Sequence, residues 1–235
     1  MKVSKITAAV VVAAIAVGAT AAKAAGPAVV PPIGLAPGSP YELIFVTLHG
    51  TTATDPNIAY YNSFVTTEAG LSSSSVVRDA TWTAIVSTPT VNANANAPST
   101  GLYPIYNTAG QLLEPAGTSI YTENPNGMVN AVEFDQFGNA QNGYGGIVYT
   151  GTGFNGVGWS GETLGDSGGF SRLSGSNDAF SFQGGWGDSS QDQPFPIFAL
   201  SSPITSPGGD TPEPTSLGLL GLGAIGLLAR RRRTA

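Results

Sequence analysis

The chain of 235 residues contains no cysteine, and charged residues make up only 10% of it. The absence of cysteine excludes disulfide bonds and thiolate-bound metals, so the core must be held together by burial alone. Basic residues are scarcest in the middle of the chain, where only Arg78 and Arg172 lie between Lys23 and Arg230. A body so poor in positive charge repels nucleic acid and anionic lipid, and we exclude both as partners. Divalent cations are compatible with the acidic side chains, although solubility is their simpler role.

Turn-forming residues are abundant, with 32 glycines and 17 prolines, while hydrophobic residues at 41% suffice for one core. This composition favours short strands joined by turns over long helices. We therefore predict an α+β fold in a single domain of residues 41–205, with one early helix followed by a loop-rich antiparallel sheet. A Pro/Gly/Ala-rich leader at 26–40 precedes this domain, and a linker at 206–210 follows it.

The early helix is the clearest local element. We predict that Asp55 is its N-cap and Pro56 its first residue. One face then carries the apolar side chains up to Gly70, where the pattern ends: Ile58, Tyr61, Phe64 and Val65. The expected strands are residues 41–47, 82–86, 104–107 in a hairpin with 111–113, 132–134, 147–149, 180–182 and 196–200.

Residues 1–25 are typical of a secretory signal peptide. Lys2 and Lys5 precede the apolar stretch 6–17, and small residues follow at 19–24, where a signal peptidase would cleave. The apolar stretch is too short to span a bilayer comfortably, which disfavours a retained membrane anchor. This end of the chain predicts export.

The other end has three parts in a fixed order. The sequence Thr-Pro-Glu-Pro at 211–214 precedes an apolar segment at 217–229, and four arginines follow at once. A helix of that length reaches about 20 Å, short of the roughly 30 Å hydrocarbon core, so it would be a poor permanent anchor. The arginines would stay in the cytoplasm and leave the body outside. We predict a transient sorting tail at 211–235, with an ordinary C-terminal membrane helix as the alternative.

This tail closely resembles the PEP-CTERM sorting signal of Gram-negative bacteria. The resemblance implies that an exosortase in the inner membrane recognises the chain and delivers it to the cell surface or the extracellular matrix. Proteins of this kind commonly accompany exopolysaccharide and biofilm production, which makes matrix carbohydrate an expected partner. The residues that would form the sorting signal are Pro212, Glu213, Pro214, Arg230, Arg231, Arg232 and Arg233.

The body resembles a group of exported bacterial proteins, many with the same tail. The phrases that carry this resemblance occur in order over residues 41–204: YELIFVT, IAYYNSFV, TWTAIVST with VNANAN, PIYN, VYTGTG and IFALSSPI. Several of them are similar to the endostatin branch of the C-type-lectin-like fold, with its "PIVN" hairpin and "VWHGS" strand. The resemblance implies such a fold, but the cysteines and the basic heparin-binding face of that branch have no counterpart here.

The run Gly-Asp-Ser-Gly-Gly at 165–169 spells the nucleophile segment of trypsin-like proteases. In that interpretation Ser167 is the nucleophile, the sole histidine, His49, is the base, and Asp79 or Asp135 orients it, with oxyanion donors at Gly165 and Ser167. The order His, Asp, Ser is the one these enzymes require.

The context of the run opposes a protease. Thr47-Leu48-His49-Gly50 lacks the Ala-Ala-His-Cys context of the family, Phe170 replaces the usual proline, and the body before Ser167 is too short for two barrels. A glycine-rich loop is also what this composition favours. We interpret the run as a loop and His49 as a surface residue, and we retain the protease as the alternative.

Calcium is the remaining chemical option. Partial lectin-like patterns place Glu123, Asn124 and Asp188 as candidate Ca²⁺ ligands, because carboxylate and amide oxygens suit this cation. The simpler interpretation is a turn beside a core tryptophan, and Trp82 and Trp159 are likewise expected in the core rather than as sugar platforms. We therefore expect a non-enzymatic exported surface protein with a structural, adhesive or carbohydrate-binding role and without an obligatory cofactor.

Overall fold

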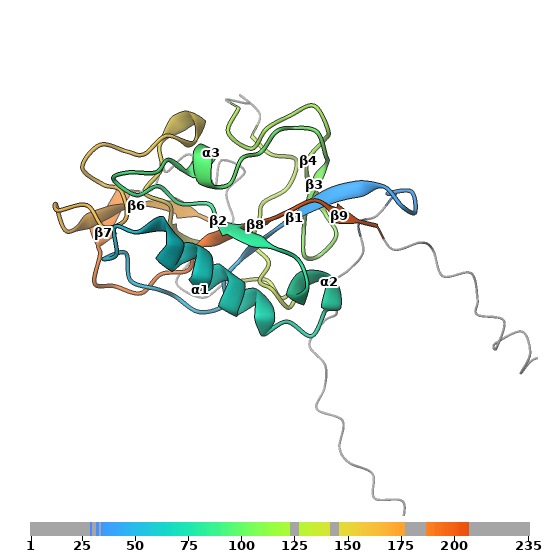
Figure 1. Cartoon of the computed structure of the whole chain (residues 1–235), viewed down its shortest axis with the longest axis horizontal. Coiled ribbons are helices and arrows are strands. Elements are labelled where there is room, and N and C mark those ends of the chain that lie inside the picture. The colour runs from blue at the N-terminus through green and yellow to red at the C-terminus, as the bar shows by residue number, and fades with distance from the viewer. Residues whose placement is uncertain are drawn as a thin grey trace, which may run out of the picture.

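Two β-sheets and one long helix make up the body of the computed structural model, which describes residues 29, 32, 34–122, 127–141, 146–176 and 187–206 (Figure 1). The larger sheet has the strand order β2-β8-β1-β3-β4, and β9 pairs with β1 beyond this path. The smaller sheet has the order β5-β6-β7. The strands are β1 Pro40–Val46, β2 Trp82–Ala84, β3 Ile105–Asn107, β4 Leu112–Glu114, β5 Ile147–Tyr149, β6 Phe170–Gly175, β7 Gly187–Ser190, β8 Phe198–Ser201 and β9 Ile204–Thr205.

Strand β1 is the centre of the larger sheet because every residue after Pro40 is buried. Leu43 and Phe45 face the core cluster under helix α1 (Ile58–Gly70), and Ile44 and Val46 face a second apolar cluster on the other side. A strand buried on both faces is a continuous apolar run rather than an alternating one. The predicted fold class, a mixture of helix and sheet, is confirmed. The arrangement of the strands does not confirm the C-type-lectin-like fold that the resemblance implied.

The pairing of β1 differs from the prediction of a purely antiparallel sheet. β1 is antiparallel to β8 and β9, but it is parallel to β3, with Glu42 opposite Ile105. A parallel neighbour requires a long crossover connection, and the chain supplies one between β1 and β3 that contains α1 and β2. The antiparallel hairpin of β3 and β4 is confirmed, with an irregularity beside Ile105.

Helix α1 begins two residues later than predicted. The Asp55 side chain accepts a hydrogen bond from the amide of Asn57 at 2.7 Å, and Asn57 is the N-cap, accepting from the amide of Ala59 at 3.0 Å. Asp55 therefore stabilises a turn ahead of the helix instead of capping it. The predicted inner face is confirmed, because Tyr61 and Val65 are fully buried.

The core is apolar and aromatic, as a chain without cysteine requires. Trp82 is buried, contacts Phe45 edge-on at 4.6 Å between ring centroids, and donates its indole hydrogen to the carbonyl of Val77 at 2.7 Å. The core position predicted for Trp82 is confirmed. Short helices α2 (Ser75–Arg78) and α3 (Ala93–Asn96) lie beside this sheet, and Val29 and Leu35 of the leader also pack against its core.

The exposed edge of the larger sheet is covered by asparagine side chains. The amide of Ala84 in β2 donates to Asn62 Oδ1 at 2.8 Å, and Asn96 Nδ2 donates to the carbonyl of Ala84 at 2.8 Å. Asn62 lies on α1 and Asn96 on α3, so side chains from two helices bond both main-chain polar groups of Ala84 at the edge strand β2. Side chains that bond the main chain of an edge strand leave fewer of its groups free to pair with another strand.

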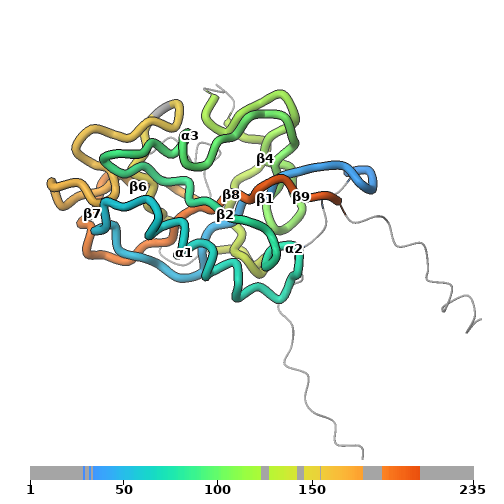
Figure 2. The backbone as a smooth tube through the Cα atoms, in the orientation of Figure 1, coloured from blue at the N-terminus to red at the C-terminus, as the bar shows by residue number. Residues whose placement is uncertain are grey.

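Several predicted strands differ from the structure. Residues 132–134 form no named strand, and Phe134 makes only an isolated bridge to Ala140. Residues 180–182 lie outside the described part of the chain. The strands β6, β7 and β9 were not predicted. The last described residues of the domain run beside the start of β1 (Figure 2). Thr205 of β9 lies opposite Pro40 of β1.

Candidate functional site

The run at 165–169 is a loop that leads directly into β6, as the interpretation of a glycine-rich loop predicts. Gly165 has a φ of +77°, and a Cβ at this position would lie 2.3 Å from Cα of Pro56. Its amide donates to the carbonyl of Ala53 at 2.6 Å. Glycine is therefore required by backbone conformation and by close approach. The amide that would serve as an oxyanion donor in a protease is used within the fold.

Gln191 holds the other side of this loop. Its buried side-chain Nε2 donates to the carbonyls of Thr163, Asp166 and Phe170 at 3.3, 3.2 and 3.1 Å. Its main chain accepts from the amide of Ala53 and donates to the carbonyl of Gly169. The sequence pattern gave no signal for this role, because the three carbonyls lie 21 to 28 residues earlier in the chain.

The three residues of the protease alternative each have a different environment. Ser167 is exposed in the loop. Asp79 follows α2 and pairs with Arg78 at 3.5 Å. His49 bonds to Glu68. Within the described part of the chain, no hydrogen bond or ion pair joins any two of these three residues. Asp135, the other candidate acid, is buried and accepts from the amides of two following residues.

The partner of His49 is a buried carboxylate on α1. Imidazole Nδ1 lies 3.0 and 3.1 Å from the two oxygens of Glu68, which also accepts from Gln136 Nε2 at 2.8 Å. The side chain of His49 is 61% exposed and that of Glu68 only 6%, so the surface position of His49 is confirmed. In the neutral imidazole, a carboxylate at Nδ1 favours the tautomer that has its proton on Nδ1 and leaves Nε2 as the acceptor. The signal for Glu68 was its position on the buried face of α1 with Tyr61 and Val65.

The proposed calcium ligands are only partly described. Glu123 and Asn124 lie outside the described residues, and Asp188 is exposed on β7 opposite Arg172 of β6. The described residues contain no group of three or more histidine, cysteine, aspartate or glutamate side chains placed to hold a metal.

Trp159 is half-buried beside β6 and belongs to neither apolar core cluster, so the core position predicted for it is wrong. The Arg172 guanidinium lies 4.4 Å from the centroid of its ring and pairs with Glu162 at 3.2 Å. A Cβ on Gly153 would lie 2.6 Å from the ring, so the backbone packs closely against it. The Arg172 guanidinium thus makes a cation–π contact with the ring, and the cluster leaves the guanidinium and the Glu162 carboxylate as its polar groups.

Burial perturbs one carboxyl strongly. Glu42 on β1 is 6% exposed, and its Oε2 has no hydrogen-bond partner among the residues that the structure describes. Removal from water disfavours the charged form and raises the pKa of Glu42 to about 7. Burial also raises the pKa of Glu114 on β4.

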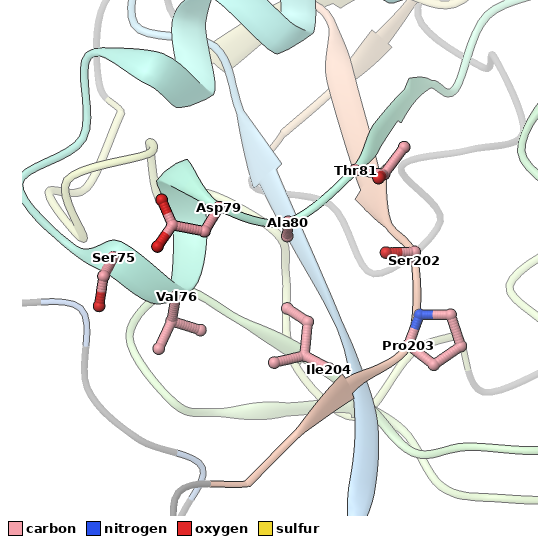
Figure 3. Close-up of a pocket in the computed structure, with 8 residues that line it drawn as sticks. All are labelled: Ser75, Val76, Asp79, Ala80, Thr81, Ser202, Pro203 and Ile204. Carbon is pink, nitrogen blue, oxygen red and sulfur yellow. The ribbon is translucent and has the colours of Figure 1, made fainter.

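A pocket of about 390 Å³ lies between α2 and the turn that joins β8 to β9. Figure 3 shows Val76 of α2 and Ile204 of β9 directed into the same space, with Asp79 at the α2 side. Its lining combines apolar side chains with hydroxyl groups and one carboxylate: Ser75, Val76, Asp79, Ala80, Thr81, Ser202, Pro203 and Ile204.

Comparison with known families matches the C-terminal end of the chain. Residues 210–233 match the PEP-CTERM protein-sorting motif. The chain therefore carries the sorting signal of an exported protein that an exosortase processes after transient anchoring in the membrane. No curated protein matches the chain.

Both predicted processing segments lie outside the described residues. These are the signal peptide at 1–25 and the sorting tail with Pro212, Glu213, Pro214, the segment 217–229 and Arg230 to Arg233. Within the described part of the chain, no helix has the length and apolar character needed to cross a membrane.

Proposed function

We propose that the chain is a non-enzymatic surface or extracellular-matrix protein with a structural or adhesive body. The match of its tail to the PEP-CTERM motif carries this proposal. The body supports it, because the Gly, Asp and Ser residues that spell a protease motif lie in a braced loop. In this proposal the tail delivers the body and the stable, cysteine-free domain acts outside the cell.

Surface display tests the sorting step. Deletion of residues 211–235 should abolish display, measured by labelling of intact cells with an antibody to the body. Glu213→Gln within the Pro-Glu-Pro motif should reduce display strongly, whereas Asp192→Asn, the same change from carboxylate to amide at an exposed residue of the body, should not. Unchanged display of the deleted chain would contradict the sorting proposal.

Carbohydrate binding is a second candidate, favoured by the surface cluster of Trp159, Glu162 and Arg172. A glycan array probed with the full chain, with and without Ca²⁺, tests it, and Glu162→Gln should weaken any binding at this cluster. A fluorophosphonate probe on the same preparation tests the protease alternative. Labelling that Ser167→Ala removes would overturn the non-enzymatic assignment.

A further inference from the structure

The chain leaves the domain beside the pocket between α2 and β9. Ile204 lines the pocket, and Ser206, the last described residue, is fixed to the start of the domain. Its amide donates to the carbonyl of Ser39 at 2.9 Å, and its carbonyl accepts from the amide of Gly38 at 3.1 Å. The starting point of the sorting tail is thus held next to the pocket.

The pocket has an apolar wall and one carboxylate, Asp79, which pairs with Arg78 outside the lining. Val76, Ala80 and Ile204 are half-buried and pack against the main core. Asp79 lines the pocket and lies 3.5 Å from Nε of Arg78, whose side chain is 47% exposed. Arg78 is one of two basic residues between Lys23 and Arg230, so few other places on the body attract a carboxylate.

The tail supplies a segment of matching chemistry. Pro212, Glu213 and Pro214 follow Ser206 closely, and the six residues from Ser206 to Pro212 span at most about 20 Å. Gly208 and Gly209 allow this stretch to turn back. Proline-rich segments adopt an extended helix that docks in apolar grooves at low entropic cost.

We propose that Pro212-Glu213-Pro214 docks in the α2–β9 pocket of its own chain. The prolines contact Val76 and Ile204, and Glu213 shares the guanidinium of Arg78 with Asp79. The body thereby covers the sorting motif, and an exosortase reaches it only when the segment leaves the pocket. This inference rests on the proposed sorting function, because it assigns the motif as the segment that is covered.

Disulfide trapping tests this contact, and the absence of native cysteine makes it specific. Val76→Cys with Pro212→Cys should form an intramolecular disulfide in the purified full chain in detergent. A bond requires Cβ atoms about 4 Å apart. The control pair Leu71→Cys with Pro212→Cys uses an exposed residue outside the pocket lining. We expect the pocket pair to oxidise at least tenfold faster, and Arg78→Gln to slow it about threefold.

Equal oxidation rates of the two pairs, or disulfides formed only between chains, would overturn self-docking. If Val76→Cys lowers the melting temperature, Pro203→Cys with Pro212→Cys replaces it, because Pro203 is exposed and also lines the pocket. Surface display is read separately. Trapping with no effect of tail deletion on display would overturn the proposed function alone, whereas normal sorting with no trapping would overturn this inference alone.

Discussion

The larger sheet and the β6–β7 part of the smaller sheet are stabilised by different kinds of contact, whereas β5 contributes Val148 and Tyr149 to the apolar core. In the larger sheet, β1 is buried on both faces, and the side chains of Tyr41, Phe45 and Phe198 are almost fully inaccessible. In the smaller sheet, the residues buried in β6 include Ser171 and Ser174. Its adjoining loop is held by the Gln191 side chain.

The difference shows two ways in which a chain without cysteine and with few charges stabilises its strands. Where strand-forming apolar residues are consecutive, burial of apolar area stabilises the sheet. Where glycine and serine dominate, buried carbonyls need hydrogen-bond donors, because an unsatisfied buried polar group is costly. A single amide side chain, such as that of Gln191, then stabilises the loop by donating hydrogen bonds to several carbonyls.

Truncation of one phenylalanine in each sheet gives the largest test of this comparison. Phe45→Ala should lower the free energy of unfolding by about 4 kcal/mol, because Phe45 is fully buried against Trp82. Phe170→Ala on β6 should change it by less than about 0.5 kcal/mol, since that ring is 50% exposed. Chemical denaturation of both variants measures the difference. Equal losses would contradict the contrast between the sheets.

Glu42 in the larger sheet lowers the stability of the fold when its carboxyl group is charged. A raised pKa means that the folded state binds the proton more tightly than the unfolded chain does. The contribution of Glu42 is therefore most favourable below about pH 4.5 and is lost as pH rises to about 7. This loss amounts to about 3 kcal/mol at 1.36 kcal/mol per pKa unit.

Denaturation of wild type and Glu42→Gln across this pH range measures the loss. The variant should be the more stable protein above pH 7, and the advantage should shrink on acidification. An advantage that does not depend on pH would contradict the burial of an ionisable Glu42.

The sequence predicted the parts of the fold that depend on local pattern. The apolar run of β1, the amphipathic face of α1, the β3–β4 hairpin and the position of β5 are confirmed. The parallel pairing of β1 with β3 was missed, because the choice of neighbour depends on the path of the chain between them. Strand β7, with the sequence Gly-Asp-Ser-Ser, carries no strand pattern and is formed by its pairing with β6.

The candidate sites were less predictable than the fold. The loop at Ser167 was predicted from its glycine content, and the surface position of His49 from the polar turn of Gly50, Thr51 and Thr52 that follows it. The contact of His49 with Glu68 and that of Gln191 with the loop join residues far apart in sequence. Such contacts depend on how the elements pack, which no local pattern encodes.

Substitution of two glycines in the same loop distinguishes the cost of a steric clash from the cost of a left-handed backbone conformation. Both have positive φ, at +77° for Gly165 and +73° for Gly169, but only Gly165 faces Pro56 at contact distance. Gly165→Ala should cost roughly 2–3 kcal/mol, from the left-handed conformation together with the steric clash. Gly169→Ala should cost about 1 kcal/mol, from conformation alone. Thermal unfolding compares them, and equal costs would show that the contact with Pro56 is unimportant.

Gln191 provides the smallest and most specific test of how the smaller sheet is held. Gln191→Ala removes the donor to three carbonyls and should cost about 2 kcal/mol. Gln193→Ala, the same change at an exposed site two residues later, should be nearly neutral. Hydrogen exchange should show faster exchange of the amides of Gly169 and Arg172 only in the first variant, while β1 stays protected. Uniform loss of protection in both sheets would instead show that the loop and the larger sheet unfold as one unit.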